Sequence, residues 1–115
     1  MKASDVTTKA SKWLADESKT AWGDSVLVEH LKAALHRLCH DRPDVLLTDA
    51  GLIERSEAID DLDAITDDLP ESIDGRYLSP LAHLVCHFCY LHDADSTANL
   101  NLATTHLELY RNGIA

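Results

Sequence analysis

The sequence predicts an all-α protein, a compact bundle of four to six helices that ends in a helical hairpin over about residues 80–111. Three observations support this fold class. Apolar residues recur at spacings of three and four, only four glycines and three prolines interrupt the 115 residues, and 45% of the chain is hydrophobic. The length suits one domain, so residues 1–115 are expected to fold as a single helical unit.

Two helices are expected before the first proline. The first should span residues 5–21, with Ser4 as its N-cap and Trp13 on its apolar side. The second should span residues 24–39, because five apolar residues recur along it at helical spacing. These residues are Leu27, Leu31, Ala34, Leu35 and Leu38. Pro43 should prevent the helix from continuing, since the residue before a proline avoids helical backbone angles.

The middle of the chain predicts one or two further helices. A short helix is expected over residues 44–50, because Pro43 suits a first helical turn. A longer helix is expected over residues 52–69, with its acidic residues mostly opposite its apolar ones. Gly51 weakens the junction, so one kinked helix and two separate helices both remain open. Residues 71–78 are expected to form a loop.

The last third of the sequence predicts the hairpin. Serine and proline at residues 79–80 are typical of a helix start, and residues 80–92 are apolar nearly all round. A helix of that kind belongs at the centre of a fold. The final helix should be capped by Asp95 or Ser96 and end at Gly113, with a stripe that packs on the central helix.

The charge of the chain is concentrated in one segment. The formal net charge is −10, and residues 41–74 hold twelve acids and two arginines, which gives 12 − 2 = 10 negative charges. The rest of the chain holds eight acids and eight basic residues and is neutral. A localised block of one sign is typical of a binding surface, although a solvated helix face kept acidic for solubility remains the alternative.

The acidic face at about residues 54–74 therefore predicts a site for a protein partner with a basic surface. The expected partner-binding residues are Glu57, Asp60, Asp61, Asp63, Asp67, Asp68, Glu71 and Asp74. Direct nucleic-acid binding is not expected, because the chain has no basic patch to neutralise phosphates. The sequence thus favours a non-catalytic inhibitor or adaptor. A structural subunit that forms a homodimer through an apolar face is a further alternative.

Histidine and cysteine clusters raise the alternative of a metal site. Zinc needs four nitrogen or sulfur donors, which two facing helices could supply. The candidate ligands are His36, Cys39, His40, His83, Cys86, His87 and Cys89. Free cysteines are commonly buried. A structural Cys-x-x-Cys pair usually sits in a turn that lets both sulfurs turn inward, whereas this one lies inside an apolar helix. We therefore expect core packing, with no metal and no cofactor, and keep metal binding as the alternative.

No catalytic motif accompanies these clusters. The sequence lacks a glycine-rich phosphate loop, a nucleophile elbow and a zinc-protease motif, so we expect a protein that is not an enzyme. Residues 1–22 do not resemble a signal peptide, and the longest apolar stretch, residues 81–91, is too short to span a bilayer. An odd number of cysteines, three, favours a reducing cytoplasmic location.

One short stretch resembles a known family. Residues 43–48 read Pro-Asp-Val-Leu-Leu-Thr, which is similar to a segment of helical immunity proteins of type VI secretion effectors. In general character the chain also resembles phage anti-CRISPR proteins and immunity proteins that block bacterial toxins. The resemblance implies an inhibitory protein-binding function. It covers six residues, and no functional residue is carried over from it.

Overall fold

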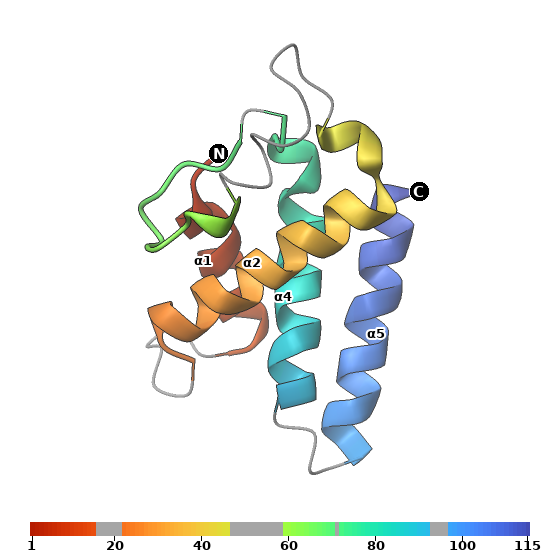
Figure 1. The fold of residues 1–115 in the computed structure, drawn as a ribbon. Coiled ribbons are helices and arrows are strands. Elements are labelled where there is room, and N and C mark those ends of the chain that lie inside the picture. Colours follow the sequence, from red (N-terminus) through yellow and green to blue (C-terminus); the bar gives the residue numbers. More distant parts are fainter. Residues whose placement is uncertain (16–21, 47–58, 71, 93–96) are drawn as a thin grey trace.

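The computed structural model describes residues 1–15, 22–46, 59–70, 72–92 and 97–115. These residues form four α-helices, namely α1 (Ala3–Trp13), α2 (Asp24–Asp41), α4 (Leu78–His92) and α5 (Thr97–Ile114) (Figure 1). Two short 3-10 helices accompany them: η1 (Pro43–Leu46) follows α2, and η2 (Gly75–Tyr77) leads directly into α4. The predicted all-α class and the terminal hairpin are confirmed, and no strand occurs in the described ranges. The radius of gyration of 13.6 Å is that of a compact chain of this length.

Helix α4 forms the centre of the fold. It contains no Asp, Glu, Lys or Arg, and α1, α2 and α5 all pack against it. Most of its side chains are buried, including Leu81, Leu84 and Val85 at 0% exposure. The strongest packing joins α4 and α5, which run antiparallel side by side in Figure 1. Burying an apolar helix on several sides removes the most apolar surface from water, which is why this segment takes the central place.

Helix α2 follows its predicted stripe, whereas α5 follows its own only in part. Ala103 and Tyr110 of the α5 stripe are buried, but Leu100, also predicted to lie on it, is 46% exposed. The α2 leucines Leu27, Leu31, Leu35 and Leu38 are fully buried. A hydrogen bond joins the C-terminal ends of the two helices, because the Tyr110 hydroxyl donates to Oδ2 of Asp41 at 2.8 Å.

None of the helices in the described ranges has both the length and the apolar character needed to cross a bilayer.

The first helix differs from its prediction at both ends. Helix α1 begins at Ala3, so Ser4 lies inside it and is not the N-cap. The N-cap is Lys2, and Asp5 at the third helical position completes a capping box, because its Oδ2 accepts a hydrogen bond from the backbone N–H of Lys2 at 2.9 Å. The helix ends at Trp13, and Ala15 adopts a φ of 56°, a left-handed conformation that ends helical continuation. The rest of the predicted helix, residues 16–21, lies outside the described residues.

The boundaries of the other predicted elements shift in both directions. Helix α2 extends two residues beyond residue 39, and α4 starts at Leu78, two residues early. Helix α5 runs through Gly113 to Ile114, so the glycine does not end it. The predicted short helix begins as the 3-10 turn η1, with residues 47–50 outside the described part. The predicted loop at residues 71–78 contains η2, whose N-cap Asp74 accepts a hydrogen bond from the N–H of Arg76.

The predicted helix over residues 52–69 is wrong in its second half. Ile59 and Asp60 are helical, but the chain leaves helical geometry at Asp61 and continues through turns and bends to residue 70. Two influences explain the difference. The side chain of Asp67 accepts hydrogen bonds from the backbone N–H groups of Asp63 and Ala64, which competes with a helix. The backbone also pairs with the start of the chain, through an antiparallel bridge between Lys2 and Asp68.

Candidate functional site

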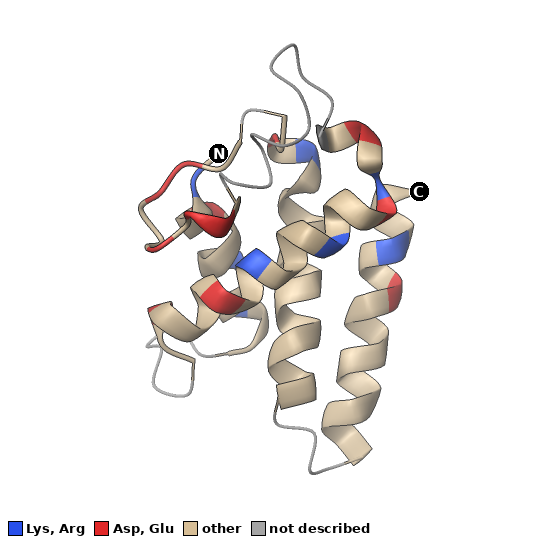
Figure 2. Ribbon diagram, viewed as in Figure 1, with Lys and Arg blue, Asp and Glu red and all other residues tan. Residues whose placement is uncertain are grey.

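Residues 59–70 form what we call the acidic loop, which lies beside the N-terminal end of α1 (Figure 2). Three apolar side chains hold the loop in the core. Ile59 is 0% exposed, Leu62 3% and Leu69 5%. Exposed aspartates alternate with these anchors, so the loop presents carboxylates outward while its apolar side chains fix its position.

Backbone hydrogen bonds attach the acidic loop to the first residues of the chain. The N–H of Ala3 donates to the carbonyl oxygen of Asp67 at 2.9 Å, and the N–H of Ser4 donates to that of Ile65 at 2.7 Å. In return, the N–H of Leu69 donates to the carbonyl oxygen of Met1 at 2.9 Å. The first N–H groups of a helix have no partner within the helix. The loop supplies such partners to α1, and the attachment holds the loop in one conformation.

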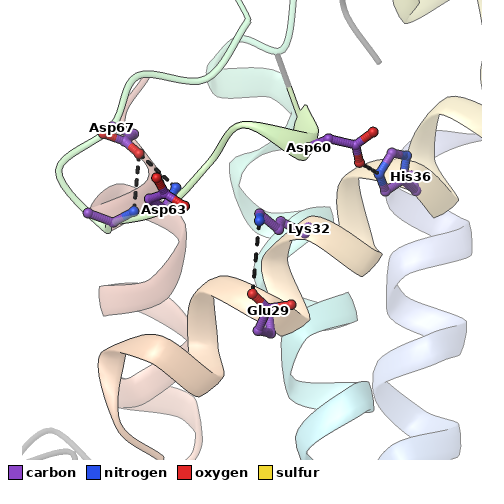
Figure 3. A network of polar contacts seen from close by, with 7 residues as sticks. Glu29, Lys32, His36, Asp60, Asp63 and Asp67 are labelled. Carbon is purple, nitrogen blue, oxygen red and sulfur yellow. Dashed lines mark hydrogen bonds and ion pairs between the residues drawn. The ribbon is translucent and has the colours of Figure 1, made fainter. Parts of the chain in front are cut away.

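Asp67 organises the turn inside the loop. Its Oδ2 accepts hydrogen bonds from the backbone N–H groups of Asp63 at 2.9 Å and Ala64 at 3.1 Å, as Figure 3 shows. These two donors, that of Asp63 first, lower the pKa of the Asp67 carboxyl from its usual value of 3.8. Asp67, predicted as a partner-binding residue, therefore stabilises the turn of the loop through its side chain.

Two further predicted residues have partners of their own. Asp60 Oδ1 lies 2.8 Å from Nε2 of His36, which joins the start of the loop to α2 (Figure 3). Asp74 Oδ1 accepts hydrogen bonds from the backbone N–H and from Nε of Arg76, both at 3.0 Å. The bond from the Arg76 side chain is the main cause of the lowered pKa of Asp74.

Three carboxylates of the acidic loop point to solvent. Asp61, Asp63 and Asp68 are exposed, and their side chains form no ion pair or hydrogen bond with another residue of the described part. The other predicted partner-binding residues, Glu57 and Glu71, lie outside the described residues. The acids that the sequence places on a helix face therefore lie, in the described part, mainly on a loop. Asp67 stabilises the turn of this loop, whereas Asp61, Asp63 and Asp68 remain exposed.

The alternative metal ligands do not converge. No group of three or more His, Cys, Asp or Glu side chains within the described ranges could hold a metal ion. Cys39, Cys86 and Cys89 are buried thiols that form no disulfide. Burial raises the pKa of the Cys86 thiol to about 12, so its sulfur is protonated at neutral pH. His40 is exposed on the last turn of α2.

The histidines of α4 are instead engaged in helix packing. Nδ1 of the buried His87 lies 2.6 Å from the carbonyl oxygen of Ala103 on α5. Nδ1 of His83 lies 2.9 Å from Nδ1 of His106, also on α5, so one imidazole donates and the other accepts. These contacts join the two arms of the hairpin.

His83 and His106 belong to a stack of rings that we call the histidine stack. It consists of Trp13, His83, His106 and Tyr90. The ring centroids of Trp13 and His83 are 4.1 Å apart, and those of Tyr90 and His106 are 5.7 Å apart. Sequence reasoning did not connect His106 with His83, because 23 residues and a helix reversal separate them. Only the approximate hairpin register could have suggested their contact.

Comparison with protein family models, with curated proteins and with solved structures found no match to this chain.

Proposed function

We propose that this protein is a non-catalytic inhibitor or adaptor, which binds a basic surface of a partner protein through the acidic loop. The observation that carries the proposal is the exposed set Asp61, Asp63 and Asp68, held on a loop whose backbone is attached to α1. Carboxylates on a fixed backbone lose little conformational freedom when they bind, so more of the electrostatic attraction is available for binding.

The distribution of charge supports the same proposal. All of the net charge of −10 arises within residues 41–74, so the electric field of the molecule points to one side. Such a field orients a basic partner before contact and raises the association rate, with an effect that salt screens. Three buried cysteines without a disulfide suit a reducing cytoplasm, where we propose that the protein acts.

The test compares two triple variants that remove the same amount of charge. One is Asp61→Asn, Asp63→Asn and Asp68→Asn in the acidic loop. The matched control is Asp24→Asn, Glu29→Gln and Glu108→Gln on α2 and α5. Wild-type protein is used to isolate the partner from the host, and association rates with the purified partner are then measured at several salt concentrations. We expect the loop variant to associate about tenfold or more slowly, and the control to keep most of the wild-type rate.

A pair of single variants tests the shape of the loop. Asp67→Ala removes the turn contacts, whereas Asp68→Ala removes the same charge without removing a side-chain hydrogen bond. We expect only Asp67→Ala to lower the melting temperature.

If both triple variants lose the partner equally, net charge alone is responsible and the proposed site is wrong. If neither changes binding, the acidic loop is only a solvated surface.

A further inference from the structure

An open groove of about 600 Å³ lies on the side of α1, next to the start of η2 and α4. Its lining includes Lys9, Lys12 and Trp13 on α1, with Gly75 and Leu78 on the other side. This volume is within the range of small-molecule binding sites. The groove is distinct from the exposed aspartates of the acidic loop, none of which lines it.

The groove holds two cations in a chain of net charge −10. The Lys9 ammonium is fixed, because Nζ donates a hydrogen bond to Oγ of Ser79 at 2.8 Å and lies 5.3 Å from the centroid of the Trp13 ring. An ammonium group has three donors, so Lys9 can still donate to a ligand. Lys12 is exposed one helical turn further along, on the same side of α1.

The acid in the groove is already engaged. Asp5 lines the groove, and its Oδ2 accepts the backbone hydrogen bond from Lys2 that caps α1. Residues 1–15 hold three lysines and this one acid, whereas residues 41–74 are strongly negative. The ammonium groups of Lys9 and Lys12, which line the groove, attract an anion to it at short range.

Apolar atoms form the remaining walls. Trp13 is 36% exposed and stacks on His83, which fixes the position of its indole. Leu78 and Met1 are half-buried beside the groove. A cation pair next to an apolar wall fits a ligand with a charged head and an apolar body.

From these contacts we propose that the groove binds a small organic anion, a carboxylate or phosphate group attached to an apolar body. The anionic head accepts hydrogen bonds from Nζ of Lys9 and Lys12, and the apolar body covers the exposed part of Trp13. Charge-assisted hydrogen bonds supply the selectivity for an anion, and burial of the apolar body supplies the affinity.

The experiment titrates the full chain with three probes that share one apolar body: cyclohexanecarboxylate, cyclohexyl phosphate and the neutral cyclohexanemethanol. The chain has two tryptophans, so Trp22→Phe leaves Trp13 as the reporter of fluorescence. The indole N–H resonance of Trp13 in the wild-type protein gives a second readout, should Trp22→Phe fail to fold. We expect saturable binding of at least one anion, about tenfold or more tighter than the alcohol.

The variants Lys9→Met and Lys12→Met keep an apolar stem and remove the ammonium, and Lys32→Met on α2 is the matched control. We expect each groove variant to weaken anion binding about tenfold and the control to leave it unchanged. The relative affinities of the carboxylate and the phosphate identify the preferred head group. Equal binding of the alcohol, absence of saturation with both anions, or an equal loss in Lys32→Met would each overturn the proposal.

Discussion

His83 shows how a single half-buried ring links stability to pH. Its imidazole stacks on Trp13 of α1 and forms a hydrogen bond with His106 of α5. The charge of Lys9 on α1 also acts on it. Burial, followed by the neighbouring His106 and Lys9, lowers the pKa of His83 from 6.5 to about 4. The pKa values of His106 and His30 are lowered in the same direction, mainly by burial. At these three positions the fold favours the neutral imidazole.

We expect the melting temperature to fall as the pH decreases from about 6.5 to about 4. In this window the unfolded chain binds a proton at His83 and the folded chain does not, so acid stabilises the unfolded state. The contribution of His83 is fully present above pH 6.5. Thermal unfolding monitored by circular dichroism across this range measures the effect.

Two histidine variants separate His83 from general acid effects. His83→Gln should flatten the pH dependence, whereas His40→Gln, at an exposed position on α2, should retain the wild-type slope. The aspartates with lowered pKa values, such as Asp67 and Asp74, lose their contributions only below about pH 3.8, outside the histidine window. An unchanged slope in His83→Gln would contradict this assignment.

At the scale of the element, α5 depends on a glycine inside the helix. A Cβ atom at position 113 would lie 2.8 Å from Cγ and 3.4 Å from Cβ of Pro80, at the start of α4. Alanine normally stabilises a helix relative to glycine by about 1 kcal/mol. Here the proline ring has little freedom to move, so glycine permits the close packing of α5 against α4.

We therefore expect Gly113→Ala to lower the free energy of unfolding by about 1 kcal/mol, because the overlap outweighs the helix propensity. The exposed neighbour provides the control, since Asn112→Ala should be neutral or slightly stabilising. Urea unfolding of both variants makes the measurement. A gain in stability for Gly113→Ala would show that Pro80 can move aside.

The elements that the sequence predicts well are those with a periodic apolar stripe. Helices α2 and α5 each pack on the apolar helix α4, so local pattern and tertiary structure largely agree. The helix over residues 52–69 fails beyond Asp60, because its backbone pairs with the first residues of the chain. No local sequence pattern predicts the hydrogen bond between Leu69 and Met1.

The candidate site is predictable to a similar extent. Charge concentration identifies the acidic segment from composition alone. The separate roles of Asp67, which shapes the turn, and of Asp68, which stays exposed, depend on backbone geometry that residue type does not encode. The groove beside α1 requires that residues near 9 and 75 meet, which only the fold establishes.

At the scale of the whole molecule, the net charge of −10 opposes folding through self-repulsion. We expect the melting temperature to rise between about 10 mM and about 150 mM NaCl, because the screening length shortens from about 30 Å to about 8 Å. The ion pairs of the described part lie largely at the surface, so their weakening by salt has little effect. Differential scanning calorimetry across this range makes the measurement.

The triple variant Asp61→Asn, Asp63→Asn and Asp68→Asn provides the comparison. It should melt at a higher temperature than wild type at low salt and respond less to added NaCl. A melting temperature that falls with salt would mean that attractive charge pairs outweigh the repulsion.

The attachment of the acidic loop to α1 has a consequence for the order in which the chain assembles. Four residues separate α4 from α5, whereas the contact between Met1 and Leu69 joins positions 69 − 1 = 68 residues apart. Closing a long loop costs more entropy, and distant contacts form slowly. We expect the hairpin to form early and the acidic loop to dock among the last steps. The surface proposed to meet a partner would then also be the first to open, which allows a partner to stabilise the fold by holding that surface closed.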